Sequence, residues 1–292
     1  MITNKIHCSI GVMAHNEEKN IASVLTSLLS QELEHVAIDE IIVISSGSTD
    51  KTNIIVQDFV EKHSKVKLIL QNERRGKSSA INLFIKSAKN DILVVESADT
   101  KPTNTTVERL VRPFRNPKVG MTGGRPMPCD DGIGFIEFAV QLLWRLHHEM
   151  AIFQPKLGEM VAFRRVFDAI PEESAVDEAS IEALITAAKL NCVYVSSAII
   201  INSGPESICD FIKQRKRIAI GHLWLKDNQN YSVTSNQIGL LFALFIRECI
   251  KSPRDIVKIT MVAKLEMCCR LLGFFEYKVM KSNPFIWEMV NR

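Results

Sequence analysis

EIIVISSGSTD, residues 40–50, joins a continuous apolar run to a short polar turn. Strands buried on both faces of a sheet read as such unbroken Val/Ile/Leu runs, and small residues after the run allow a tight turn into a helix. Apolar periodicity predicts that helix over residues 51–62. The same succession recurs along the chain. It predicts strands at 6–13, 66–70, 91–95 and 119–123, and helices at 17–30, 78–89 and 107–114.

Strand–helix alternation predicts a Rossmann-like, mainly parallel sheet flanked by helices on both faces. Asn16 is the expected N-cap of the helix at 17–30. The pattern changes after residue 130. It then predicts helices at 133–150, 178–188 and 207–224, strands at 159–164, 192–196 and 198–202, and tail helices over 236–281 broken near Pro253. We expect an α/β domain in residues 1–225 and a helical C-terminal extension in residues 226–292.

The composition is that of a globular protein, with 46% hydrophobic residues and a net charge of +3 in 292 residues. It excludes collagen-like and wholly disordered chains. Residues 204–292 hold 14 Lys and Arg against 8 Asp and Glu, which favours an anionic partner such as phosphate groups or a lipid surface.

The cysteine pattern and the apolar runs address the cellular location. Seven cysteines without a CxxC pair suggest neither a zinc ribbon nor a disulfide framework. The first residues turn acidic too soon for a signal peptide. The longest clean apolar run, residues 238–246, is shorter than the ~20 residues that span a bilayer. We expect a cytoplasmic protein, or one peripheral on the cytoplasmic face of a membrane.

Three polar clusters follow predicted strands, at residues 15–17, 45–50 and 97–99. Ligands of open α/β sheets bind beyond the carboxyl ends of the strands, so these clusters predict a binding site. Asp99 follows a buried strand, where an acid can hold a divalent cation that bridges a diphosphate. Taken alone, each cluster also fits an ordinary turn or helix cap.

Three further motifs carry charge. Residues 73–78, ERRGKS, form a basic loop before a helix that could bind phosphate or be a solvated surface loop. Asp177 and Glu178 open a helix. A carboxylate there can deprotonate a hydroxyl group, or can simply be an ordinary first-turn acid that the helix dipole stabilises. Residues 214–217, QRKR, could fork onto phosphate or form a solvated helical face.

In this order and spacing, the motifs resemble those of family 2 glycosyltransferases with the GT-A fold, over roughly residues 6–225. The resemblance implies that Glu178 is the catalytic base beside Asp177 and that Asp99 is the surviving acid of the DxD metal motif. It places Gln214, Arg215 and Arg217 near the diphosphate and acceptor. It assigns the nucleotide sugar to His15, Asn16, Glu17, Ser46, Gly47, Ser48, Asp50, Arg75, Lys77 and Asp99.

Three positions depart from the family pattern. Ser46 stands where many members have an acid that faces the base, which leaves the nucleotide open. Ser97 replaces the first acid of DxD, which removes one candidate metal ligand. Ile218 replaces the Trp of Q-x-x-R-W, which argues against processive synthesis of a long polymer.

The sequence therefore predicts an inverting, non-processive glycosyltransferase. We expect a nucleoside-diphosphate sugar as donor, a glycan or lipid-linked acceptor, and Mn²⁺ or Mg²⁺ as cofactor, with no nucleic acid partner. For the tail we expect contact with an anionic membrane surface, with the rest of the chain, or with a second copy. The alternatives are a nucleotidyltransferase on a similar sheet and a catalytically weak protein that binds nucleotide sugar or lipid.

Overall fold

The structure, a computed structural model, describes residues 5–129, 134–236 and 238–286. The chain forms two compact units. The first comprises Met1–Pro126, Leu157–Glu172 and Asp177–Asn202, and the second comprises Met127–Lys156, Glu173–Val176 and Ser203–Arg292. The domain boundary near residue 225 rests on the sequence alone and stays a prediction.

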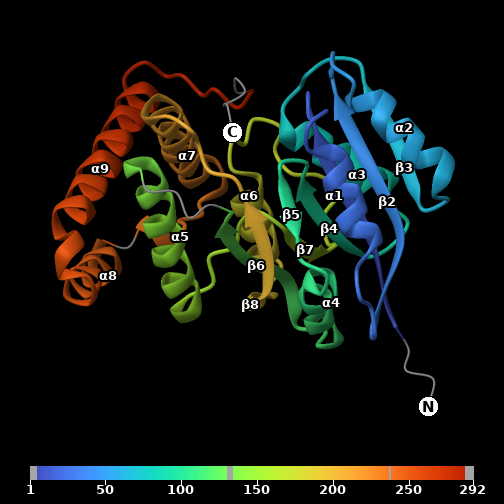
Figure 1. Ribbon diagram of the computed structural model, residues 1–292, viewed down its shortest axis with the longest axis horizontal. Coiled ribbons are helices and arrows are strands. Elements are labelled where there is room, and N and C mark those ends of the chain that lie inside the picture. Colours follow the sequence, from blue (N-terminus) through green and yellow to red (C-terminus); the bar gives the residue numbers. More distant parts are fainter. Residues whose placement is uncertain (1–4, 130–133, 237, 287–292) are drawn as a thin grey trace. The chain divides into compact units, whose positions relative to one another are not determined.

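Within the described residues, the strands of the first unit form one sheet in the order β3-β2-β1-β4-β7-β6-β8-β5 (Figure 1). Half of it is the expected parallel core, in which β1 pairs with β2 and β4, and β2 pairs with β3. The bounds of these strands are β1 Ile6–Ala14, β2 Val36–Ser46, β3 Val66–Gln71 and β4 Ile92–Ser97.

The other half of the sheet contains antiparallel pairs, so the sheet as a whole is mixed. β7 (Val161–Arg164) runs against both β4 and β6 (Val119–Pro128). β5 (Thr100–Pro102) runs against β8 (Asn191–Asn202). The two strands expected at 192–196 and 198–202 are one strand, because Ser196 and Ser197 are exposed residues of continuous β8 rather than a break.

Helices cover both faces of the sheet, as expected. Alternating residues of β1 and β2 point to opposite faces. Val12 and Val43 pack with α1 (Ile21–Leu29), α2 (Thr52–Lys62) and α4 (Thr106–Val111), which continues into a 3₁₀ turn at Arg112–Arg115. Met13 and Ile44 pack on the other face with α3 (Lys77–Ser87) and α6 (Asp177–Ala187).

The start of α1 corrects the sequence prediction. The helix begins at Ile21 rather than at residue 17, and Asn20 is its N-cap residue. Asn16 does not cap it, because its backbone is left-handed with φ 52° and its side chain accepts the Thr49 amide at 2.8 Å. The side chain therefore holds a neighbouring turn instead of the helix.

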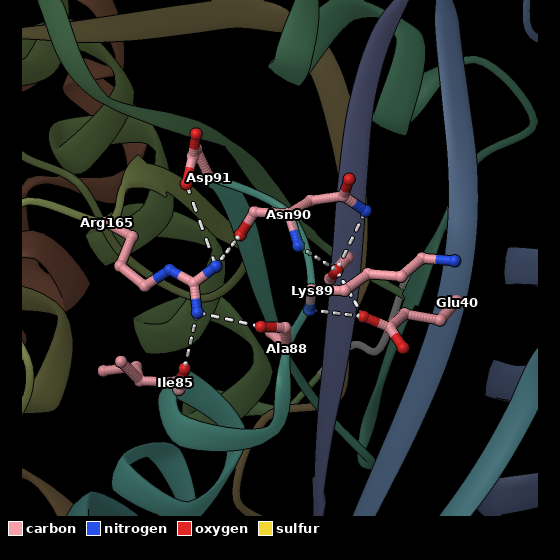
Figure 2. Close-up of polar contacts among 8 residues, drawn as sticks. Glu40, Ile85, Ala88, Lys89, Asn90, Asp91 and Arg165 are labelled. Atoms are coloured by element: carbon pink, nitrogen blue, oxygen red, sulfur yellow. Dashed lines mark hydrogen bonds and ion pairs between the residues drawn. The ribbon is translucent and has the colours of Figure 1, made fainter.

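The paired arginines after β7 anchor two chain segments. Figure 2 shows the Arg165 guanidinium donating to the carbonyls of Ile85, Ala88 and Asn90, at 3.2, 2.8 and 2.8 Å. Two of these carbonyls belong to the C-terminal end of α3, where backbone acceptors lack helical partners. Arg164 donates in the same way to the carbonyl of Phe114 at 2.7 Å.

The second unit is helical. α5 reaches Phe153, and the residue at which the sequence predicted its start, Ile133, lies outside the described part of the chain. The predicted break at Pro253 separates the two tail helices. No helix among the described residues is long and apolar enough to cross a membrane. The helices are α5 Phe135–Phe153, α7 Ile208–Gln229, α8 Ile238–Lys251 and α9 Ile256–Lys278, with 3₁₀ turns at Thr234–Asn236 and Pro253–Asp255.

Candidate active site

The turns that follow β1 and β2 are joined by hydrogen bonds in both directions. The Asn16 amide donates to Ser48 Oγ at 3.1 Å, and the Thr49 amide donates to Asn16 Oδ1 at 2.8 Å. The Glu18 amide donates to Asp50 Oδ2 at 3.0 Å. Two polar clusters 30 residues apart in the sequence thus form one structure, at the edge of the sheet where the parallel strands end.

Several predicted donor-binding residues hold this structure together. Burial alone would raise the pKa of Asp50, but hydrogen bonds from Thr52 and the Glu18 amide hold it below its ordinary value. Ser46 Oγ donates to Gln71 at 2.6 Å. Glu17 accepts from Asn20 at 2.8 Å. Their contacts with a nucleotide sugar stay predictions.

Gly47 allows a close approach of the basic loop. Its φ is 62°, in the left-handed region, and a Cβ there would lie 2.8 Å from the backbone nitrogen of Arg74. A larger residue at this position would push the loop away from the turn. The glycine of the SGS turn is therefore required by the chain passing over it.

His15 is held by a hydrogen bond at the end of β2. Its Nδ1 donates to the Ser46 carbonyl at 2.6 Å, which leaves Nε2 as an acceptor. Burial lowers its pKa, and the charge of Arg74 adds to the shift. The structure thus brings Arg74 into the electrostatic surroundings of His15, whereas Arg75 forms an exposed ion pair with Glu172 at 3.2 Å.

Lys77 connects α3 to the start of α6. Gly76, with φ 90°, precedes the helix, and Lys77 is its first residue. Its Nζ lies 2.9 Å from Asp177 Oδ2 and 2.9 Å from Glu178 Oε1. Burial opposes the charge on Lys77, but the two carboxylates outweigh burial and raise its pKa. The lysine that the sequence assigned to the nucleotide is thus bound to the candidate base.

The acid pair opens α6, where the helix dipole favours negative charge. Asp177 is buried, and Glu178 is half-buried. Burial and the neighbouring Asp177 raise the pKa of Glu178, while Lys77 opposes the rise. A carboxylate with a raised pKa is a stronger base than one in water, which suits proton abstraction near neutral pH.

Two more acids belong to these surroundings, and the sequence analysis did not single them out. Glu96 is fully buried in β4, its Oε1 accepts from Thr100 at 2.7 Å, and its Oε2 has no hydrogen-bond partner among the described residues. Burial and the charge of Glu159 raise the pKa of Glu96 to about 8.

Glu159 adopts a left-handed backbone with φ 58° ahead of β7. Burial and the charges of Glu178 and Asp177 raise its pKa to about 7. Its rare backbone conformation marks it, but that conformation is not readable from the sequence. The site therefore holds more carboxyl groups than the sequence had assigned to it.

Asp99 is the candidate cation ligand. It lies half-buried in the turn between β4 and β5, and the neighbouring Ala98 amide bonds to the carbonyl of Met13 at the end of β1. Among the described residues, no group of three His, Cys, Asp or Glu could hold a metal ion. A carboxylate oxygen suits Mg²⁺ or Mn²⁺, which are commonly held by one or two carboxylates and completed by substrate phosphates. The residues present fit a cation that arrives with a diphosphate.

Gln214, Arg215 and Arg217 lie on α7 in the second unit. Arg215 forms a bidentate ion pair with Glu266 of α9, at 2.7 and 2.8 Å. Burial opposes the charge on Glu266, but Arg215 and Arg270 lower its pKa to about 2. This guanidinium fork is thus engaged within the second unit, and the proposed contact of all three residues with a diphosphate or acceptor stays a prediction.

Comparison with known proteins gives the site its context. A family model described as Glycosyl transferase family 2 matches residues 9–184. The probable glycosyltransferase YdaM of Bacillus subtilis is 33% identical over 121 residues, which cover 40% of this chain and 29% of that protein. The poly-beta-1,6-N-acetyl-D-glucosamine synthase of Staphylococcus epidermidis is 34% identical over 113 residues, covering 38% of this chain and 26% of the relative. The matched segment thus spans less than a third of these curated relatives.

Solved structures with the same architecture confirm the GT-A fold. The mannosyltransferase PcManGT from Pyrobaculum calidifontis, in complex with GDP-Man and Mn²⁺, has a TM-score of 0.66 at 17% identity and covers 97% of this chain and 83% of its own. Glucosyl-3-phosphoglycerate synthase from Mycobacterium tuberculosis, with Mn²⁺, UDP and glucosyl-3-phosphoglycerate, has a TM-score of 0.53 at 20% identity, covering 75% of this chain and 79% of its own. At these identities the likeness concerns the fold.

Proposed function

The chain belongs to glycosyl transferase family 2, and on that premise we propose that it moves a sugar from a nucleoside-diphosphate sugar to a hydroxyl group with inversion at the anomeric carbon. The observation that carries the proposal is the acid pair at the start of α6. Its Glu178 is a half-buried carboxylate with a raised pKa, and it forms an ion pair with Lys77. The family match favours glycosyl transfer over the nucleotidyl transfer that the sequence left open.

Glu178 serves as the general base. The proton of the acceptor hydroxyl passes to its carboxylate while the hydroxyl oxygen bonds to the anomeric carbon. The bond between that carbon and the diphosphate oxygen breaks, and the nucleoside diphosphate leaves with the electron pair. General-base help of this kind contributes ~10²–10⁴-fold. Lys77 orients the carboxylate, because its Nζ bonds to Glu178 and Asp177 at once.

The donor binds at the joined turns after β1 and β2. Small residues in these turns allow a nucleotide to approach the backbone closely, and the basic loop adds positive charge for the diphosphate. Arg74 joins the expected Arg75 as a candidate, since its charge acts on His15 within the turn. The complexes of PcManGT with GDP-Man and of the mycobacterial synthase with UDP support a nucleotide-sugar donor of this class.

Asp99 would hold a divalent cation, Mn²⁺ or Mg²⁺, together with the phosphates of the donor. Such a cation neutralises charge on the leaving diphosphate. The Mn²⁺ and Mg²⁺ complexes of the solved neighbours support this cofactor. Because Ser97 replaces a second acid, we expect metal binding to be weak until the donor is bound.

The acceptor is a glycan or a lipid-linked sugar, and transfer is non-processive. Ile218 on α7, in place of the family's Trp, supports the latter. The match to the poly-beta-1,6-N-acetyl-D-glucosamine synthase supports a saccharide acceptor. Because it covers only 26% of that relative, it does not identify the acceptor.

Glu178→Gln tests the proposed base. The substitution keeps the shape of the side chain and removes its basic oxygen, so we expect transfer to fall by ~10²-fold or more while donor affinity is retained. The measurements are sugar transfer by product assay and donor binding by calorimetry. Glu61→Gln, the same change on exposed α2, is the matched control. Wild-type turnover in Glu178→Gln would move the base elsewhere, with Asp177 the next candidate.

Chelation tests the cation in the same assay. We expect EDTA to abolish transfer, added Mn²⁺ to restore it, and Asp99→Ala to behave like the chelated wild type. Full activity in EDTA would instead mean that Arg and Lys side chains, and not a cation, neutralise the charge on the leaving diphosphate.

A further inference from the structure

α9 carries an apolar stripe on the face turned away from the core of its own unit. The apolar members that we use below are exposed by 51–67%. At 100° per residue, all members fall within about 40° of one line along the helix, which runs for roughly 33 Å at 1.5 Å per residue. The α9 stripe consists of Val257, Met261, Lys264, Cys268, Leu271, Phe275 and Val279.

The opposite face of α9 already supplies the packing that the helix needs. Ile259, Val262 and Cys269 are buried there. At Gly273 a Cβ would lie 3.0 Å from the Lys216 carbonyl of α7, so the two helices approach closely. In Figure 1, α9 lies at the margin of its unit beside α5 and α7. The stripe is therefore additional to the core rather than part of it.

α8 repeats the arrangement over a shorter length. Phe242, Ile246 and Ile250 recur every fourth residue and are exposed, whereas Leu244 and Glu248 on the other side are buried. Exposed apolar surface of this extent is unusual for a protein that meets only water. Two successive helices thus present apolar residues outward.

Charges on α8 and α9 are sorted by sign. The acids face inward: Glu248 lies 3.4 Å from Arg145, and Glu266 is paired with Arg215. Glu276 lies 2.6 Å from Lys216. The exposed charges are basic, and one of them, Lys264, lies within the stripe. Arg247 and Lys251 pair with Glu149, Lys258 with Asp255 and Lys278 with Asp227, in ion pairs that are partly exposed to solvent and therefore weak. The exposed basic residues of this region are Arg247, Lys251, Arg254, Lys258, Lys264, Lys278 and Lys281.

We propose that the α9 stripe lies flat on an anionic lipid surface, with its apolar side chains among the acyl chains and its basic residues at the headgroups. An apolar face bordered by Lys and Arg is the pattern of a helix in the plane of a membrane interface. A second copy fits less well, because pairing two identical stripes would oppose basic borders of like charge. This inference goes beyond the proposed function and does not depend on it, since the surface acts without a donor or acceptor.

Vesicle co-sedimentation of the full chain tests the proposal. The probes are phosphatidylcholine vesicles alone and phosphatidylcholine vesicles with about a third phosphatidylglycerol, each over a series of NaCl concentrations. We expect binding to the anionic vesicles, at least tenfold weaker binding to the neutral ones, and loss of binding as salt screens the basic residues.

Matched variants separate the stripe from a general effect. Leu271→Ser combined with Phe275→Ser removes two exposed side chains whose burial in lipid drives binding, so the partition coefficient should fall at least tenfold. Lys264→Glu should weaken binding to the anionic vesicles and leave binding to the neutral vesicles unchanged. The controls are Ile54→Ser, which removes a still more exposed apolar residue on α2, and Lys86→Glu on α3, and both should bind like the wild type. Unchanged circular dichroism shows that each variant is folded.

Three results would overturn the proposal. The protein could stay in the supernatant with anionic vesicles at low salt, or bind neutral and anionic vesicles equally. Light scattering could also show a dimer that the stripe variant dissociates while vesicles capture nothing, in which case a second copy covers α9. None of these results bears on Glu178, because transfer to a soluble acceptor is measured separately.

Discussion

At the scale of single residues, the position of Lys77 changes the interpretation of its motif. The sequence placed the basic loop 73–78 beside a nucleotide, and the charge of Lys77 suited that role. In the structure its ammonium group is shared between Asp177 and Glu178. A group that neutralises the candidate base also sets the pH at which that base is active, which makes its role measurable.

Lys77→Met should shift the pH dependence of turnover. Lys77 opposes the rise in the pKa of Glu178, so its removal raises that pKa further. A base must be deprotonated to act, so the acidic limb of the kcat profile should move up by about one pH unit or more, with activity recovering at higher pH. Lys77→Arg keeps the charge and should leave the limb near its original position. A folded Lys77→Met variant with an unchanged limb would uncouple Lys77 from the base.

The sequence could identify the acid pair but not the two acids beside it. Asp177 and Glu178 were visible because they open a helix and match a family motif. Glu96 follows an apolar run in the sequence. At such a position the pattern predicts an exposed residue at the end of a strand and does not indicate a buried carboxyl group. Arg74 and Arg75 are adjacent and chemically identical, and only the path of the loop over Gly47 separates them. Such distinctions depend on tertiary contacts that no local pattern encodes.

At the scale of secondary-structure elements, the Arg165 contacts give a structural role to a residue to which the sequence had assigned none. Its guanidinium caps α3, the helix whose first residue is Lys77 (Figure 2). Backbone carbonyls at a helix C-terminus are stabilised by cationic donors. Arg165 thereby holds the C-terminal end of α3, and the N-terminal residue of this helix, Lys77, lies in the candidate site.

Arg165→Lys should destabilise the fold, because lysine keeps the charge but cannot fork between several carbonyls. Hydrogen bonds to charged groups contribute about 1.5–3 kcal/mol, so we expect a loss of about 2 kcal/mol in the free energy of unfolding. Urea unfolding followed by circular dichroism measures it. Arg112→Lys, on an exposed arginine, is the control and should unfold with the wild type. Equal midpoints for both variants would show that the fork contributes little.

Element by element, the strands were the most predictable part of the fold. Mainly apolar runs located β1 to β4, and Pro253 located the break between α8 and α9. The start of α1 was wrong because Asn16 is a good capping residue, yet its side chain holds the Thr49 amide. The antiparallel half of the sheet was not foreseen, since strand direction depends on which strands pair and not on their composition.

At the scale of the whole molecule, the raised pKa values of the site should appear as a pH dependence of stability. Glu96 keeps its proton in the native state up to about pH 8, whereas an unfolded glutamic acid releases it near 4.5. Between these values the native state binds more protons, so this group's contribution to stability falls as pH rises. Carboxylates with lowered pKa, such as Asp50 and Glu266, lose their contribution only as pH falls toward acid.

Histidines oppose this trend below pH 6.5. His15, His147 and His222 have pKa values lowered from 6.5 by burial, so the unfolded state binds their protons more readily and stability rises with pH up to that value. Glu159, with a pKa of about 7, acts in the same direction as Glu96 over a narrower range. In the interval from pH 6.5 to about 8, Glu96 therefore determines whether the free energy of unfolding rises or falls with pH.

Over that interval we expect the free energy of unfolding to fall with rising pH, with a slope of at most about 1.4 kcal/mol per pH unit from one such group. Glu96→Gln cannot ionise, so its curve should be flatter than that of the wild type, and the variant should gain stability relative to the wild type as pH increases. Urea unfolding in EDTA across this range measures both curves free of any bound cation. Glu61→Gln removes an exposed carboxyl group and should keep the wild-type slope. A wild-type curve that is level or rises with pH would mean that Glu96 is ionised in the folded protein. Its buried carboxylate would then need a cationic partner, and Lys77, whose charge already acts on it, would be the first residue to examine.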